Sequence, residues 1–175
     1  MSSNELAAEI NATCRLSGQF TLRSGQTAAE YFDKYLFESE PALLRRVSKA
    51  MVPLVPANTD LLGGLELGGV PLVTVLSQLT GVPAVFVRKE AKRYGTCRLA
   101  EGADVAGRQV TMIEDVITTG GAVRNAALAL RQLDARVNVV LCAINRGMAG
   151  SNPLADIGLE VRSVLTHDDL DSEQD

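Results

Sequence analysis

The sequence predicts an α/β domain in which helices flank a central, mostly parallel sheet, and three features support this fold class. Apolar, strand-like runs alternate with helical patterns through the second half of the chain, an order typical of parallel sheets. A turn rich in Thr and Gly joins one of these strands to a helix. The 175 residues contain no repeat and no linker, so they suit one domain with a single core.

The first half of the chain holds short elements. Pro41 favours a helix start, because proline is tolerated in the first turn of a helix. Glycine pairs at 63–64 and 68–69 mark the end of a strand and the approach to a further helix. The expected elements are a helix at 4–13, extended segments at 20–22 and 31–37, a helix at 41–51, a strand at 60–62 and a helix at 71–79.

The second half has clearer patterns. Strands are expected at 84–87, 109–113 and 137–144, and an apolar stripe predicts a helix at 121–133. Residues 89–107 are polar, basic and contain glycine, which favours a long mobile loop. A terminal strand is expected before an acidic tail at 168–175, which should be frayed.

Composition excludes several function classes. The net charge of −4 argues against a broad nucleic-acid surface, and no apolar run reaches membrane-spanning length. The three cysteines are widely spaced, and His167 is the single histidine, so neither a disulfide framework, a zinc motif nor a His-based triad is expected. The N-terminus has no signal-peptide character, which favours a cytoplasmic protein. The dense basic segment at 88–98 suggests a small anionic ligand.

The turn after the strand at 109–113 has the composition of a phosphate site. Glu114 and Asp115 end the strand, and the residues from Thr118 to Ala122 lead into the next helix. Glycines allow close approach of the backbone, and N–H groups at a helix start favour a phosphate. Carboxylates would repel that phosphate but can accept hydrogen bonds from neighbouring hydroxyls. A phosphate beside a vicinal diol describes a ribose 5-phosphate.

An ordinary strand–turn–helix with capping threonines is the alternative, but the two acids at this offset favour the ligand site. The segment resembles the phosphoribosyl diphosphate (PRPP) signature of the type I phosphoribosyltransferases. The resemblance implies the fold of that family, with a small N-terminal hood at about 1–40 in a single domain of residues 1–175. It also implies that PRPP is bound by Arg88, Lys89, Lys92, Glu114, Asp115, Val116, Ile117, Thr118, Thr119, Gly120, Gly121 and Ala122.

The basic segment resembles the mobile catalytic loop of the orotate phosphoribosyltransferases, although a solvated hairpin could have the same composition. Cleavage of the C1–O bond of PRPP releases an anionic diphosphate, so cations and exclusion of water are needed. The resemblance implies that Lys92 is the main catalytic lysine, with Asp115 as a further catalytic residue. Arg88 and Lys89 would contact the diphosphate, and the role of Tyr94 is open.

Two further segments resemble the same family. Residues 20–25 and 31–33 are similar to its hood, with Arg23 where lysine is usual, and Asn145-Arg146 is similar to the Asp-Arg that ends a strand there. Without the other segments, a core aromatic pair and a surface arginine would be the simpler readings. The resemblance implies that orotate is bound by Arg23, Phe32, Thr118 and Arg146.

The resemblance implies transfer of the phosphoribosyl group from PRPP to orotate in the synthesis of UMP. It implies a Mg²⁺ cofactor held mainly through PRPP rather than by metal ligands of the chain. It also implies a homodimer with shared sites, and no nucleic-acid or membrane partner. Some relatives carry a lysine on the diphosphate in the loop that here reads Leu67-Gly68-Gly69.

Three alternatives stay open. A purine phosphoribosyltransferase would share the phosphate turn but not the basic loop or a carboxylate-binding arginine. A non-catalytic PRPP-sensing regulator would keep the fold, but the acid pair and Lys92 argue against it. A plain structural domain would leave all four segments as coincidence.

Overall fold

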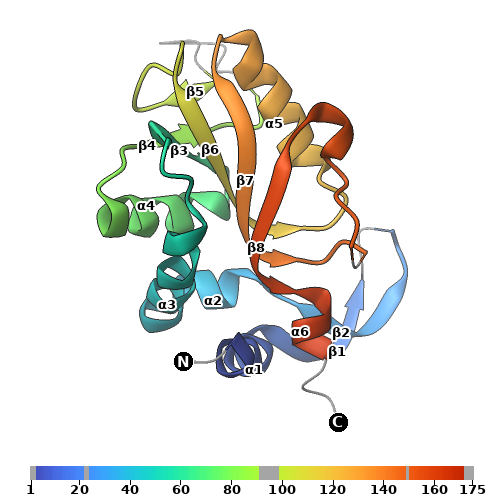
Figure 1. The fold of residues 1–175 in the computed structure, drawn as a ribbon. Coiled ribbons are helices and arrows are strands. Elements are labelled where there is room, and N and C mark those ends of the chain that lie inside the picture. Colours follow the sequence, from blue (N-terminus) through green and yellow to red (C-terminus); the bar gives the residue numbers. More distant parts are fainter. Residues whose placement is uncertain (1–2, 22–23, 91–98, 149, 172–175) are drawn as a thin grey trace.

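Within residues 3–21, 24–90, 99–148 and 150–171, which the computed structural model describes, six strands form the central sheet (Figure 1). Their order is β5-β4-β3-β6-β7-β8; β5 is antiparallel to its neighbour, and the other pairs are parallel. The strands are β3 (Leu61–Leu65), β4 (Ala84–Val87), β5 (Ala100–Glu101), β6 (Gln109–Ile117), β7 (Arg136–Asn145) and β8 (Glu160–Thr166). The predicted α/β class with a mostly parallel sheet is confirmed.

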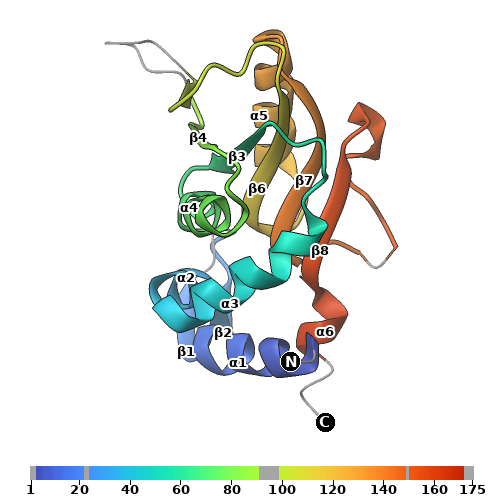
Figure 2. The same cartoon turned by 60° about the vertical axis from the view of Figure 1, so that its left-hand side comes forward.

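Helices cover both faces of this sheet (Figure 2). On one face lie α3 (Pro41–Met51) and α4 (Gly69–Thr80), and on the other lies α5 (Gly121–Gln132). Side chains of β7 alternate between the two cores: Leu141 and Ala143 join the core with α3 and α4, whereas Val140 and Cys142 join the core with α5. Two 3₁₀ turns, η1 (Val52–Leu54) and η2 (Ala155–Ile157), complete the connections.

The N-terminal elements form a unit below the sheet in Figure 1. They are α1 (Ser3–Cys14), the antiparallel pair β1 (Arg15–Thr21) and β2 (Thr27–Phe32), and α2 (Tyr35–Ser39). The prediction of an extended segment at 31–37 is wrong beyond Phe32, because α2 begins at Tyr35. The Asp33 carboxylate accepts a hydrogen bond from the backbone N–H of Tyr35 and turns the chain, and Phe37 is fully buried in the core.

Residues 168–171 of the acidic tail are helical, contrary to the prediction that the tail frays from residue 168. Helix α6 (His167–Asp171) begins with a capping box, in which the Asp169 carboxylate accepts hydrogen bonds from the backbone N–H and hydroxyl of Thr166. The Leu170 side chain is 2% exposed. The Thr-x-x-Asp pattern at 166–169 predicts this cap from the sequence. The burial of Leu170, in contrast, depends on packing against α1.

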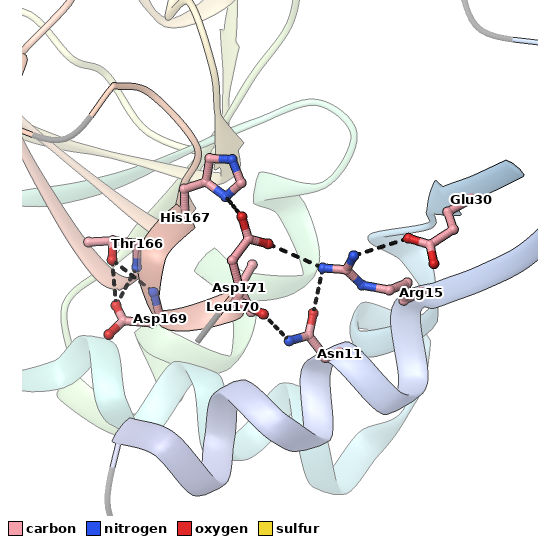
Figure 3. Close-up of polar contacts among 8 residues, drawn as sticks. All are labelled: Asn11, Arg15, Glu30, Thr166, His167, Asp169, Leu170 and Asp171. Atoms are coloured by element: carbon pink, nitrogen blue, oxygen red, sulfur yellow. Dashed lines mark hydrogen bonds and ion pairs between the residues drawn. The ribbon is translucent and has the colours of Figure 1, made fainter. Parts of the chain in front are cut away.

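Polar contacts fasten α6 to the N-terminal unit (Figure 3). The Asn11 side chain donates to the Leu170 carbonyl at 2.5 Å, and Arg15 makes ion pairs with Asp171 and with Glu30 on β2. The last strand of the sheet runs directly into α6. The carboxyl ends of the parallel strands β6, β7 and β8 therefore face the N-terminal unit (Figure 1).

Two strand predictions need correction. Strand β6 does not end at the acid pair but continues to Ile117, because Glu114 and Ile117 stay in register with Cys142 and Asn145 of β7. The region 89–107 is not loop throughout, since β5 pairs with β4 within it. No helix in the described ranges has the length and apolar character needed to cross a membrane.

Candidate active site

The turn from β6 to α5 lies at the carboxyl edge of the sheet, where ligands bind in such folds. Gly120 takes a left-handed conformation with φ of 73°, and a Cβ there would lie 3.0 Å from Leu154, so both the turn and its packing favour glycine. Thr118 and Thr119 are exposed before it, and Gly121 and Ala122 are exposed after it. Hydroxyls and the first N–H groups of α5 thus face an open space, as a phosphate requires.

Arg146 and Phe32 come together beside this turn. The backbone N–H of Arg146 donates to the Ile117 carbonyl at 2.7 Å, which holds the end of β7 against the end of β6. The Arg146 guanidinium carbon lies 5.3 Å from the centre of the Phe32 ring, a cation–π contact between β7's end and the hairpin. Both residues line a cavity of about 330 Å³ together with Arg15 and Glu30. Two of the residues predicted to bind orotate therefore share one cavity, next to Thr118.

A second cavity, of about 220 Å³, is lined by residues at the end of β4 and at the start of α5. It brings Arg88 and Lys89, at the end of β4, beside Ala122 at the start of α5. The backbone N–H of Arg88 donates to the Leu99 carbonyl, and that of Lys89 donates to the Glu66 carboxylate at 2.5 Å. The two cations predicted to contact the diphosphate, Arg88 and Lys89, thus lie beside the end of the Thr118–Ala122 turn. The predicted residues Arg23 and Lys92, as well as Tyr94, fall outside the described ranges.

The predicted acid pair is buried within β6. Asp115 is fully buried and Glu114 is 9% exposed. The Glu114 carboxylate accepts the Asp115 N–H at 3.0 Å, and the Asp115 carboxylate accepts the Val116 N–H at 2.5 Å. Ile117 is also buried, 1% exposed, so the contacts predicted for it would be made by its backbone. The strand therefore holds both carboxyl groups in place through its own backbone.

Two residues that the sequence reasoning missed complete this cluster. The Lys34 ammonium lies 2.5 Å from Asp115 Oδ2, and the Glu38 carboxyl, 7% exposed, also reaches Asp115. Lys34 and Glu38 stand one helical turn apart at the start and in the body of α2, so they share a face. The spacing of four residues between Lys34 and Glu38 indicates a shared face only if the segment is a helix. This segment was predicted to be extended, so the signal was not used.

The side chains of this cluster shift one another's pKa values. Burial, together with a hydrogen bond and the charge of Asp115, raises the pKa of Glu38 to about 9 and that of Glu114 to about 8. Burial would also raise the pKa of Asp115, but hydrogen bonds with Glu114, Glu38 and Lys34 lower it. Burial would lower the pKa of Lys34, but the bond to Asp115 and its charge raise it. The raised pKa values favour the protonated forms of Glu38 and Glu114, and the lowered pKa of Asp115 favours its carboxylate.

This cluster is poorly suited to be a metal cage. In the described part of the chain, no group of three His, Cys, Asp or Glu side chains is arranged to hold a metal ion. The Lys34 ammonium already pairs with the Asp115 carboxylate at 2.5 Å.

Proteins named orotate phosphoribosyltransferase are similar to this chain both in sequence and in fold. A Nocardioides protein named orotate phosphoribosyltransferase is 70% identical over 95% of this chain and 93% of its own length. A crystal structure of Mycobacterium tuberculosis orotate phosphoribosyltransferase with Fe(III) dicitrate has a TM-score of 0.82 and 32% identity, covering 96% of this chain and 98% of that one. Another structure of that enzyme, in complex with PRPP, has a TM-score of 0.77 and 28% identity over 97% of this chain and 98% of the other. No profile of a protein family matches the sequence.

Proposed function

The chain belongs to the orotate phosphoribosyltransferase family, and we propose that it transfers the 5-phosphoribosyl group of PRPP to orotate. A pyrimidine nitrogen of orotate forms a bond to C1 of the ribose while the bond from C1 to the diphosphate oxygen breaks. The products are orotidine 5′-monophosphate and diphosphate. No general base is essential, because orotate can attack as an anion.

The observation that carries this proposal is the meeting of two sites at one edge of the sheet. The Thr118–Ala122 turn at the end of β6 adjoins the cavity that Arg146 and Phe32 line, and the Arg146 N–H to Ile117 bond links them. A guanidinium suits the orotate carboxylate, and an aromatic ring suits the flat pyrimidine. A phosphate site and a site for a flat anion, side by side, are what this reaction requires. Arg23 is the further residue that we assign to orotate.

The ribose would lie between these two sites, over the acid pair. We assign Glu114 and Asp115 to the ribose hydroxyls, and the N–H groups of residues 119–122 would surround the 5-phosphate with the Thr118 and Thr119 hydroxyls. Fixing the ribose at both ends holds its C1 toward the orotate cavity, which lowers the entropic barrier to attack.

Charge on the leaving diphosphate needs cations. Arg88 and Lys89 line the second cavity beside the phosphate turn, and we assign them to the diphosphate together with Lys92. Bound Mg²⁺ would offset part of the same charge. We also propose that two copies of the chain form a dimer in which the basic segment of one completes the site of the other. A cytoplasmic location belongs to the same proposal.

The test is base specificity with PRPP and Mg²⁺, followed by ultraviolet absorbance. Orotate, uracil, adenine, hypoxanthine and guanine are supplied in turn to the wild type, to Arg146→Ala and to Arg108→Ala. Arg108 is an exposed arginine at the opposite end of β6 and serves as the matched control. We expect turnover of orotate alone, and a fall of about 10- to 100-fold in kcat/KM for orotate in Arg146→Ala, as for lost hydrogen bonds to a charged group. The control should match the wild type.

Other outcomes separate the alternatives. Turnover of a purine would contradict the assignment of Phe32 and Arg146 to orotate. It would still support PRPP as the donor. Absence of turnover with every base, with PRPP still bound in calorimetry, would favour a PRPP-sensing regulator. Sedimentation equilibrium tests the dimer, and Lys92→Ala mixed with Arg146→Ala should regain part of the activity if sites are shared between copies.

A further inference from the structure

The strongest feature outside the assigned residues is the convergence of three segments on Asp115. Lys34 reaches it from the start of α2, Glu38 from the body of α2, and Gly68 from the loop between β3 and α4. A Cβ at Gly68 would lie 1.6 Å from Asp115 Oδ2 and 2.8 Å from Glu38 Oε1. The loop backbone therefore packs directly on this carboxylate.

Lys34 is placed there by the local structure of the hairpin exit. The Asp33 N–H donates to the Cys14 carbonyl at 2.8 Å, and the Asp33 carboxylate accepts from Tyr35 N–H at 3.1 Å, so the chain is held on both sides of Lys34. The ammonium also lies 5.3 Å from the centre of the Tyr35 ring. With 33% of its side chain exposed, Lys34 is oriented by these contacts and still borders the open edge of the sheet.

The charge of Lys34 compensates the nearby carboxylate of Asp115. The cluster has three carboxyl groups within reach of one ammonium, and the adjoining loop reads Glu66-Leu67-Gly68-Gly69, which contains no cation. A phosphoribosyl diphosphate is itself a polyanion, and an uncompensated Asp115 carboxylate in a buried place would repel it strongly. The pKa shifts of the cluster agree: burial alone would raise the pKa of Asp115, whereas hydrogen bonds with Glu114, Glu38 and Lys34 and the charge of Lys34 lower it.

We propose that Lys34 is a positioning residue for PRPP: it holds the Asp115 carboxylate in the orientation that receives the ribose hydroxyls and cancels its charge beside the diphosphate loop. Glu38 supports Lys34 by filling the remaining space around Asp115 as a neutral carboxyl group. This inference rests on the proposed function, because it assigns Asp115 to the ribose.

The test separates positioning from a merely structural ion pair. Lys34→Met removes the charge at similar length, Lys34→Gln keeps one hydrogen-bond donor without charge, and Lys34→Arg keeps the charge. Lys49→Met, at an exposed lysine on α3, is the matched control. Steady-state rates are measured with PRPP varied and then with orotate varied, PRPP affinity is measured by calorimetry without orotate, and each variant is melted to verify its fold.

We expect Lys34→Met to lower kcat/KM for PRPP by 30-fold or more and to weaken PRPP binding by at least 10-fold, while KM for orotate changes less than threefold. Lys34→Arg should recover to within about fivefold of the wild type, and Lys49→Met should not differ from it. Lys34→Gln should fold even where Lys34→Met does not, and it should show the same selective loss for PRPP.

A folded Lys34→Met or Lys34→Gln variant with PRPP kinetics within threefold of the wild type would overturn the proposal, as would equal losses for PRPP and orotate. The proposed function fails in a different way, by absence of orotate turnover in the wild type. In that case the calorimetric comparison with PRPP still decides whether Lys34 matters. A wild type that binds no PRPP would overturn both.

Discussion

Gly68→Ala is the sharpest single perturbation of the site. Gly68 has φ of −65° and ψ of −28°, which any residue adopts, so alanine adds no backbone strain and only its methyl group matters. That methyl would lie 1.6 Å from Asp115 Oδ2, far inside ordinary contact distance. The loop or the carboxylate must move by more than about 1 Å to accommodate it, and either movement separates Asp115 from Lys34 or from the ribose.

The expected losses of stability and activity in Gly68→Ala follow from the packing and the ion pair that this movement disturbs. Overpacking of a well-packed site destabilises by about 1–3 kcal/mol, and disturbance of the half-buried pair between Lys34 and Asp115 adds to this, so we expect a loss of about 3 kcal/mol. For a chain of this size that corresponds to a fall in Tm of about 6–12 °C. A misplacement of about 1 Å at a reacting centre can reduce the rate by about 100-fold, so kcat/KM for PRPP should fall by that order.

The assay compares Gly68→Ala with Gly81→Ala, by thermal melting and by kinetics with PRPP varied. Gly81 ends α4 with φ of 75° and has open space around its Cβ position, so alanine there tests a left-handed conformation without a clash. It should cost about 1 kcal/mol and leave kcat/KM unchanged. A Gly68→Ala protein with kcat/KM within threefold of the wild type and an unchanged Tm would refute the packing of this loop on Asp115.

Two further predictions concern charge and the C-terminal helix. Because the fold raises the pKa of Glu38 from 4.5 to about 9, the folded state keeps a proton that the unfolded chain has lost, so its stability falls as pH rises through this window. Glu38→Gln removes that effect, and its Tm should decline less steeply than that of the wild type between pH 5 and 9; parallel curves would contradict the burial of a protonated Glu38. Leu170→Ala should destabilise by about 2–4 kcal/mol in urea unfolding, as for other buried leucines, whereas Leu128→Ala, at a leucine 41% exposed, should have little effect. Equal small effects would mean that α6 does not pack on α1.

Local patterns were enough for much of the fold. The strand at 84–87 follows from its apolar run, the helix that begins at Pro41 from the proline, and the helix after Gly120 from the glycine and an apolar stripe. Each of these signals lies within or next to the element that it predicts. The turn that we assign to the phosphate was equally readable, because a site made of consecutive N–H groups and hydroxyls would need no distant partner. Helix α2 was missed, because it is short and buries Phe37, so tertiary packing outweighs its weak local preference.

By itself, then, the sequence determined most of the helices and strands, though not α2 or β5, and the residues of the turn, because these depend on neighbours along the chain. The alternation of strands and helices was enough to predict a mostly parallel sheet. Only the tertiary structure decided which side chain meets Asp115. Lys34 and Gly68 are remote from that carboxylate in sequence, and their approach depends on the packing of α2 and the β3–α4 loop over β6. The tertiary structure also decided the protonation of Glu38 and Glu114, because a pKa depends on burial and on charges brought close by folding rather than on residue type.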